Sequence, residues 1–301
     1  MKKIFFQFIL MMGVFTFPSY AFSKVNIFAC EPEWASLSKE IGGDMVDIKT
    51  ATSAKQNVHF IRAKPSLLSY MRKADLVFCS GSSLEIGWLP ILLKKAAGPH
   101  IQPGSNGWIM ASDFVNKIDI SKNTDRSMGH VHPEGNPHIQ LNPHNIQIIS
   151  GIVTDRLIKI DPNNSQYYKD NLEKFSSKWM DNLKKWENKI DILKGKKVIV
   201  YHKSWSYLLS WLKIDAIASL EPKPGLPPTA SHLEKILSSI KDHKKIDAIL
   251  VAPFENDKAA KWLSEKSGIP IIYLPFTVGG SDNAHDLFSL FDETLKLLEG
   301  K

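Results

Sequence analysis

The sequence has few of the features that mark several common protein classes. It contains only two cysteines in 301 residues, far apart in the chain, which argues against a thiolate zinc site or a Cys-x-x-Cys redox motif. The His-Glu-x-x-His signature of metalloproteases is missing. Beyond the N-terminal segment, no run reaches the ~18 uninterrupted apolar residues of a membrane helix. No compact basic run with interleaved aromatic residues indicates a nucleic-acid partner.

The first residues have the pattern of an export signal. Lys2 and Lys3 precede an apolar run from Ile4 to Phe17, and Pro18 and the small-x-small tripeptide Ser19-Tyr20-Ala21 follow. This order predicts a signal peptide over residues 1–21 that is cleaved after Ala21. No cysteine lies at the cleavage point, so we expect no lipid anchor on the mature chain. The mature protein is therefore expected in the periplasm.

The rest of the chain alternates short apolar runs with amphipathic segments, which predicts an α/β fold with parallel sheets. Between the two blocks, apolar residues recur every three or four positions from Tyr168 to Leu193, as on one continuous helix on the order of 40 Å long. We therefore expect two lobes, each a parallel sheet flanked by helices, at residues 22–160 and 195–301, with the long helix in a linking segment, 161–194. The expected strands span residues 24–29, 46–50, 76–79, 197–201, 214–220, 246–251 and 269–274.

The two cysteines, Cys30 and Cys79, each end a predicted strand of the first block. Adjacent strands of a sheet lie about 4.7–4.9 Å apart, within the Cα spacing that a disulfide tolerates. We predict a disulfide between them.

Histidines concentrate in one stretch. Four of the ten histidines fall within fifteen residues, at His130, His132, His138 and His144. Both His138 and His144 follow an Asn-Pro pair, where proline restricts the backbone. Imidazole is the commonest side-chain metal ligand, so the stretch is a candidate metal site. His144 fits better as a helix-start residue than as a ligand.

Polar side chains from both blocks follow predicted strands at the edge where parallel sheets bind ligands. His59 follows the second strand, His202 directly ends the first strand of the second block, and Glu255 and Asp282 follow later strands. His138 lies in the connection between the blocks. Three imidazoles and one carboxylate fit tetrahedral zinc. The pattern predicts that two lobes bring these groups together across a cleft.

These motifs together resemble the periplasmic zinc- and manganese-binding proteins of ABC metal importers, the cluster A-I solute-binding family. The matching features are a loop histidine at His59, Asn-Pro-His at 136–138, an aromatic-flanked histidine after a strand at 201–205, and the loop 221–225. The resemblance covers nearly the whole mature chain. It implies two βα lobes joined by one long helix, with the metal between the lobes.

In that family, manganese members use two histidines and two carboxylates, whereas zinc members use three histidines, so His202 points to zinc. The resemblance also implies that His130 and His132 are an auxiliary metal loop. The chain departs from the family pattern after the last strand, where the usual aspartate is displaced and Asp282 comes late. We expect Asp282 to be the fourth ligand, with Glu255 as the alternative.

We therefore predict a non-catalytic protein that captures Zn²⁺ as cargo and delivers it to the membrane permease of an ABC importer. We expect a monomer. Three alternatives stay open: a manganese-binding protein of the same transporter family, a zinc hydrolase, because three ligands plus water also form a catalytic site, and an exported adhesion protein.

Overall fold

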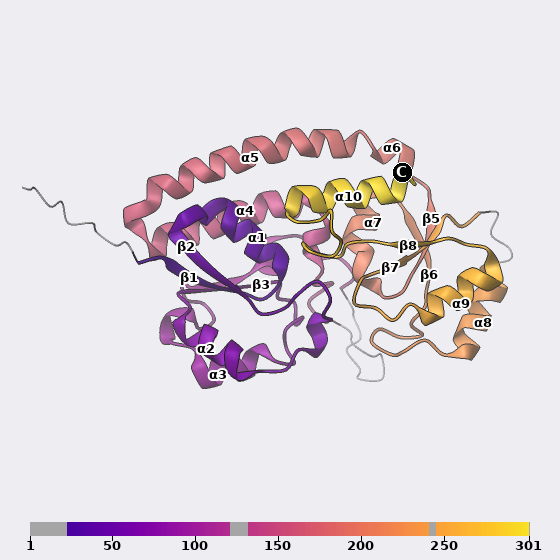
Figure 1. Ribbon diagram of the computed structural model, residues 1–301, viewed down its shortest axis with the longest axis horizontal. Coiled ribbons are helices and arrows are strands. Elements are labelled where there is room, and N and C mark those ends of the chain that lie inside the picture. Colours follow the sequence, from indigo (N-terminus) through magenta and orange to yellow (C-terminus); the bar gives the residue numbers. More distant parts are fainter. Residues whose placement is uncertain (1–22, 121–131, 241–244, 301) are drawn as a thin grey trace, which may run out of the picture.

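The computed structural model describes residues 23–120, 132–240 and 245–300, and within them it contains two parallel four-stranded sheets (Figure 1). The strand orders are β2-β1-β3-β4 and β6-β5-β7-β8. The predicted fold class is confirmed. The strands are β1 Val25–Ala29, β2 Val46–Thr50, β3 Leu76–Cys79, β4 Trp108–Met110, β5 Lys197–Val200, β6 Asp215–Ser219, β7 Ala248–Val251 and β8 Ile271–Tyr273. All seven predicted strands are present, and the three-residue β4 was missed because so short a run carries no periodic signal.

Side chains alternate between the two faces of each sheet, because successive Cβ atoms of a strand point in opposite directions. In the first lobe, Ile27 and Phe78 face the central core, whereas Phe28 and Val77 face the outer helices α2 (Pro65–Lys73) and α3 (Leu89–Ala96). In the second lobe, the outer face is covered by α8 (Ala230–Ser239) and α9 (Lys258–Ser267). Both faces are buried, which explains the nearly continuous apolar strands.

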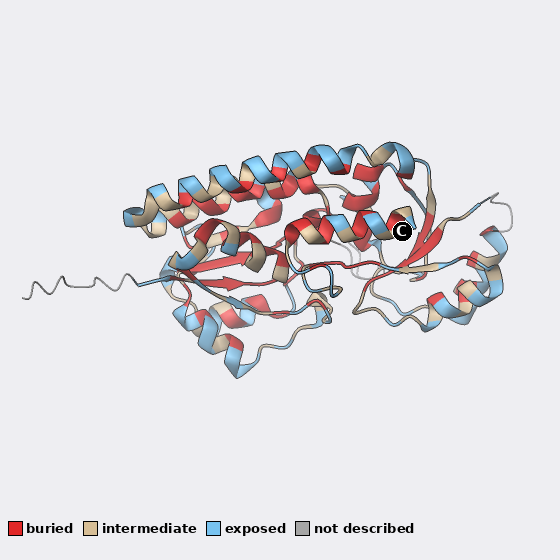
Figure 2. Cartoon of the chain, turned by 45° about the horizontal axis from the view of Figure 1, so that its top comes forward, coloured by how far each residue is buried: buried red, intermediate tan, exposed pale blue. Residues whose placement is uncertain are grey.

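The long linking helix is α5, Ser165–Glu187, and it lies across both lobes (Figure 1). Its apolar stripe is buried on one side along its length (Figure 2). The prediction of one continuous helix to Leu193 was wrong at the end, because a turn at Asn188 and Lys189 separates α5 from a short α6, Ile190–Leu193. Its 23 residues give about 35 Å. Neither α5 nor any other helix in the described ranges is long and apolar enough to cross a membrane.

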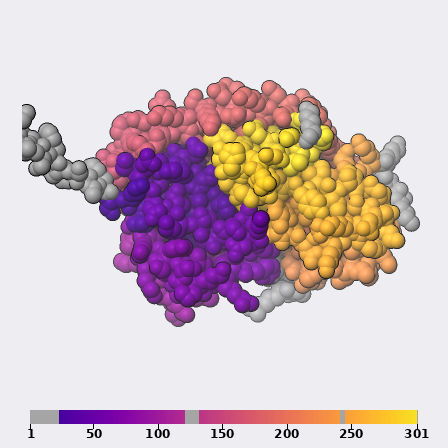
Figure 3. All heavy atoms as spheres, in the orientation of Figure 1, coloured from indigo at the N-terminus to yellow at the C-terminus, as the bar shows by residue number. Residues whose placement is uncertain are grey.

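The layer beneath α5 joins the two lobes. It consists of α1 (Pro32–Gly42), α4 (Pro143–Ile160), α7 (Ser206–Leu212) and the C-terminal α10 (Leu287–Glu299). Phe288 of α10 packs on Phe175 and Trp179 of α5, with ring centroids 5.6 and 5.1 Å apart. One buried cluster contains residues of both sheets and of this layer. In the space-filling view, α10 covers the junction between the two halves (Figure 3). The lobes therefore share a core.

The predicted disulfide is present. Cys79 ends β3 and Cys30 follows β1, its parallel neighbour, so that the two Cα atoms lie 4.8 Å apart. Both cysteines are fully buried. The bridge joins the carboxyl ends of two central strands in the first lobe.

Candidate metal centre

Three histidines from three separate loops converge on one cavity of about 260 Å³. His59 lies after β2, His138 lies before α4, and His202 lies after β5. One ring nitrogen of each lies within 4.8 Å of one ring nitrogen of each of the others. The ring centroids are 5.8, 6.0 and 6.1 Å apart. The two lobes thus bring together the three imidazoles that the sequence singled out.

Asparagines two positions earlier hold two of these histidines. The side-chain oxygen of Asn57 accepts the backbone N–H of His59 at 3.1 Å, and that of Asn136 accepts the N–H of His138 at 3.0 Å. This is the local side-chain-to-backbone turn that asparagine favours. It fixes the loop at each imidazole even where the first loop has valine instead of proline before its histidine.

The most deeply buried of the three is His138, which is only 5% exposed. Both of its ring nitrogens are buried, and neither has a hydrogen-bond partner among the described residues. Burial is the main cause that holds the pKa of His138 well below its usual range, and the positive charges that His59, His202 and His132 can carry add to it. The ring is therefore neutral, which is the form that binds metals. Buried polar atoms are rarely left unpaired, so these nitrogens indicate a ligand.

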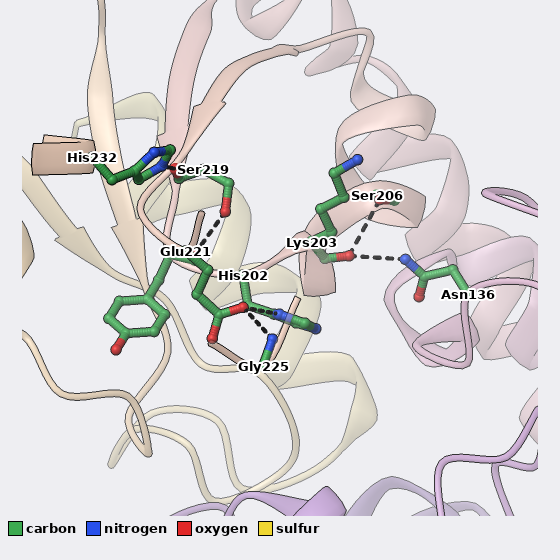
Figure 4. A network of polar contacts seen from close by, with 9 residues as sticks. Asn136, His202, Lys203, Ser206, Ser219, Glu221, Gly225 and His232 are labelled. Atoms are coloured by element: carbon green, nitrogen blue, oxygen red, sulfur yellow. Dashed lines mark hydrogen bonds and ion pairs between the residues drawn. The ribbon is translucent and has the colours of Figure 1, made fainter. Parts of the chain in front are cut away.

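His202 has a carboxylate partner of its own. Its Nδ1 lies 2.6 Å from Oε2 of Glu221, which also accepts the backbone N–H of Gly225 at 2.8 Å (Figure 4). In the tautomer that donates from Nδ1 to this carboxylate, Nε2 is the nitrogen with a lone pair for a metal. A carboxylate in this position orients a metal-binding imidazole and raises its basicity.

One further carboxylate lines the same cavity. Glu255, after β7, accepts the N–H of Ala252 through Oε2 at 2.7 Å, while its Oε1 is buried without a hydrogen-bond partner in the described part of the chain. Burial raises the pKa of Glu255 to about 8, against the lowering effect of that backbone hydrogen bond. Its oxygens are not part of the group of ligand atoms within 4.8 Å that the three histidines form.

Asp282, our first choice for the fourth ligand, is exposed and does not line the cavity. Backbone hydrogen bonds from Gly279 to Ala284 and from Ala284 to Ser281 close its loop into a compact turn at the surface. The residue that enters the site from this segment is Phe276, which is 6% exposed and packs edge-on against His138 at 5.2 Å between ring centroids. The alternative, Glu255, does line the cavity, together with Glu221.

The auxiliary loop is only partly described. The ring of His132 lies 5.2 Å from that of His59, and its Nδ1 is 2.9 Å from the carbonyl of Ser82. His132 also lines a second cavity, of about 610 Å³, together with His138 and His202. His130 lies outside the described residues. The other described histidines lie away from the cluster. His100 and His232 are hydrogen-bonded to the backbone carbonyls of Ala74 and Ser219, His144 pairs with Glu187, and His285 is exposed.

A set of buried acids lies beside the centre and was not anticipated from the sequence. Glu31 and Glu33 line a small cavity that also contacts His138, and the neighbouring Glu85 accepts the backbone N–H groups of Ser80 and Gly81. Burial is the main cause that raises the pKa of Glu33 and of Glu85 to about 7, and it raises that of Glu31 well above its usual range.

A comparison with known protein families finds one match over most of the chain. The profile of the zinc-uptake complex component A family, a periplasmic component also called ZnuA, matches residues 27–300. The chain belongs to this family. It is accordingly a metal-binding, substrate-binding protein of an ABC transporter.

Members related to this chain are named for different metals. The manganese substrate-binding lipoprotein PsaA of Streptococcus pneumoniae is 24% identical over 84% of this chain and 80% of its own. The iron substrate-binding lipoprotein MtsA of Streptococcus pyogenes is 25% identical over the same shares. A metal substrate-binding lipoprotein, SsaB of Streptococcus sanguinis, is 24% identical over 95% of this chain and 93% of its own. Family membership therefore leaves the metal open.

Solved structures of similar proteins have the same fold. A crystal structure of ZnuA superposes with a TM-score of 0.76 at 19% identity, over 92% of this chain and 99% of its own. A manganese-bound periplasmic metal-binding protein from Candidatus Liberibacter asiaticus superposes with a TM-score of 0.74 at 18% identity, over the same shares. At these identities the likeness concerns the fold alone.

Two polar residues that contact the histidine-bearing loops were not predicted from the sequence to do so. Glu221 and Asn136 belong to two motifs of the sequence, the loop 221–225 and Asn-Pro-His at 136–138, but neither was predicted to support the centre. Both carry long-range contacts, from residues 19 and 67 positions away, that no local pattern reveals. The sequence gives no signal for these contacts, because both partners lie in a loop that is distant in the chain and close only in the folded protein.

Proposed function

We propose that this protein captures Zn²⁺ outside the cytoplasm and delivers it, without catalysis, to the membrane permease of an ABC importer. The observation that carries the proposal is the cluster of three imidazoles with ligand atoms within 4.8 Å of one another. The unpaired, buried ring of His138 adds a physical reason for a bound cation, because a metal would satisfy one of its nitrogens.

The proposed ligands are His59, His138 and His202, with Glu255 completing the set in place of Asp282. Glu255 is the candidate because it already lines the cavity and has one buried oxygen without a hydrogen-bond partner among the described residues. Ionising it beside a divalent cation removes the cost of burying its charge. A neutral ligand trio with one anion leaves a net charge of +1 on the centre.

Zinc is favoured by the kind of donor atoms. Four-coordinate sites built mainly from imidazole nitrogen suit Zn²⁺, whereas Mn²⁺ prefers carboxylate and water oxygens in six-coordinate sites. The lining of the cavity contains three imidazoles and two carboxylates, and one of these, Glu221, is already bound to His202. The manganese and iron names of relatives make those metals the alternatives to test.

The remaining parts of the proposal concern transport. We propose that residues 1–21 are a cleaved signal peptide and that the mature protein acts in the periplasm as a monomer. We propose that His130 and His132 form an auxiliary site that passes metal to the triad, supported by the proximity of the rings of His132 and His59. The lobes 22–160 and 195–301 would present the loaded cleft to the permease.

A comparison of zinc and manganese affinities would decide little, because zinc binds more tightly than manganese at most nitrogen and oxygen sites. Substitution by Co²⁺ tests the coordination geometry directly. We expect the intense visible absorption of four-coordinate Co²⁺, and competition by one Zn²⁺ per chain. Glu255→Ala should alter that spectrum, whereas Asp282→Ala should leave it unchanged. A weak six-coordinate spectrum would favour a manganese-type site and contradict the zinc proposal.

A further inference from the structure

The side-chain amide of Asn136 lies between two histidine-bearing loops that belong to opposite lobes. Its oxygen accepts the N–H of His138 at 3.0 Å, and its nitrogen donates to the carbonyl of Lys203 at 2.8 Å. Lys203 directly follows His202. One amide group therefore connects the backbone at one ligand to the backbone next to another. Figure 4 shows the half of this connection that joins Asn136 to Lys203.

The rest of Asn136 is held as firmly. Its backbone N–H donates to the carbonyl of Ile118, and its carbonyl accepts the hydroxyl of Tyr207 in α7 at 3.0 Å. The second amide hydrogen reaches Oδ2 of Asp119, with the nitrogen 3.1 Å from that oxygen. The residue is 7% exposed. An asparagine amide offers two donor hydrogens and one acceptor oxygen, and here all three are used.

Other asparagines show what a purely local role looks like. Asn57 and Asn142 also accept the N–H two residues ahead, at 3.1 and 3.0 Å. Neither side chain donates to another residue within the described ranges, whereas that of Asn136 donates to Lys203, 67 positions away in the other lobe. The link to the second lobe is thus an addition to the turn and is not required by it.

We propose that Asn136 is a positioning residue that sets the spacing of His138 and His202 across the two lobes. Their ring centroids lie 6.1 Å apart, and the Asn136 amide holds the backbone at His138 against the backbone next to His202. A site prepared in this way loses less affinity to the ordering of its ligands. This inference rests on the proposed metal function and deepens it, since it names a residue that contacts no metal.

The test compares two Asn→Asp substitutions in the full mature chain. Asn136→Asp keeps the shape and the acceptor for His138 but removes the donor to Lys203 and faces the carboxylate of Asp119. Asn171→Asp is the matched control, because the Asn171 amide of α5 donates to the carbonyl of Ile41 in the first lobe at 3.0 Å, away from the two cavities.

We expect Asn136→Asp to lower Zn²⁺ affinity about 10–100-fold, as loss of supporting contacts does at other sites. Its Co²⁺ spectrum should change, and the metal-free melting temperature should fall no further than in Asn171→Asp. The Asn171→Asp control should bind Zn²⁺ within about threefold of wild type and keep the wild-type spectrum, because a structural loss alone changes stability and not coordination.

Tyr207→Phe gives a second route if Asn136→Asp folds poorly, since it removes one hydroxyl that holds the carbonyl of Asn136. A smaller loss of affinity with the same spectral change supports the inference. Wild-type affinity and spectrum in both Asn136→Asp and Tyr207→Phe would overturn it. His138→Ala separates this result from failure of the metal proposal, because unchanged binding in that variant would contradict the site itself.

Discussion

In the first lobe, Glu31 and Glu85 are buried close to the disulfide. In the second lobe, Glu221 and Glu255 line the cavity that contains the three histidines. Both pairs lie at the carboxyl end of a four-stranded parallel sheet. In the first lobe, the backbone N–H of Ser80 donates to both carboxylates, with its nitrogen 3.2 Å from Glu31 and 2.8 Å from Glu85. In the second, the shortest contact of Glu221 is to an imidazole.

The difference teaches that the same topological position can serve stability or function. The first lobe supplies two histidines to the centre but keeps its carboxylates within the sheet end, where their charge is suppressed by burial. The second lobe supplies one histidine and both carboxylates of the cavity. Substitutions in the first set should therefore change stability, and those in the second should change metal affinity.

The largest effect is expected at the histidines, which both lobes contribute. His59→Ala, His138→Ala and His202→Ala should each weaken Zn²⁺ binding by more than about 100-fold, beyond the usual cost of losing a supporting contact. Zinc should raise the melting temperature of wild type and much less that of the variants. Competition titration against a chelator measures this. His144→Ala is the control, because His144 pairs with Glu187 away from the cavity, and a large loss there would show a non-specific effect.

Removing the disulfide should expose the structural role of the first lobe. The paired substitution of Cys30 and Cys79 by serine should lower the free energy of unfolding by about 2–5 kcal/mol, because the bridge closes a loop of 49 residues. Denaturant titration of the metal-free protein gives this value. Zinc affinity under native conditions should stay within threefold, on the order of 0.6 kcal/mol. A much greater loss of affinity would mean that the two sheet ends are not independent.

A moderate effect is expected at Glu221, in the second lobe. Glu221→Ala should lower zinc affinity about 10–100-fold, because His202 loses the acceptor that orients its ring. Glu221→Gln keeps an acceptor oxygen and should lose less. Both variants should retain a metal-free melting temperature close to that of wild type. Equal affinities in all three proteins would remove Glu221 from the support of the centre.

The smallest effect concerns pH and the buried acids of the first lobe. The pKa of Glu33 is about 7 in the folded protein, raised mainly by burial, against an ordinary value of 4.5. The folded state therefore binds this proton more tightly than the unfolded state. The stability that this protonation contributes to the folded state is complete below pH 4.5 and is lost as pH rises towards 7. Glu33→Gln should remove this slope and stabilise the metal-free protein at pH 8, by roughly 1–3 kcal/mol. Parallel stability curves for the two proteins would refute this.

Much of the fold followed from local pattern. β2 and β3 begin and end at the predicted residues, because alternating apolar residues mark the first and a short continuous apolar run marks the second. The errors lie where packing between distant segments decides. The helix break after Glu187 and the return of α10 to the layer under α5 depend on contacts across the whole chain.

The histidine cluster could be predicted because parallel strands direct their following loops to one edge. The fourth position could not, since Asp282 and Glu255 both follow strands of the same sheet. What separates them is the turn that holds Asp282 at the surface and the phenylalanine, Phe276, that enters instead. The protonation of Glu33 likewise depends on burial, which the sequence does not state.

X-ray absorption at the zinc edge of the fully loaded, untagged protein tests the central claim most directly. Three imidazole nitrogens and one carboxylate oxygen should surround the ion, at about 2.0–2.1 and 2.0–2.2 Å respectively. In Glu255→Ala, the contribution of the carboxylate oxygen should be lost, and all three imidazole nitrogens should remain. A shell of five or six oxygens with fewer than three imidazoles would contradict the account.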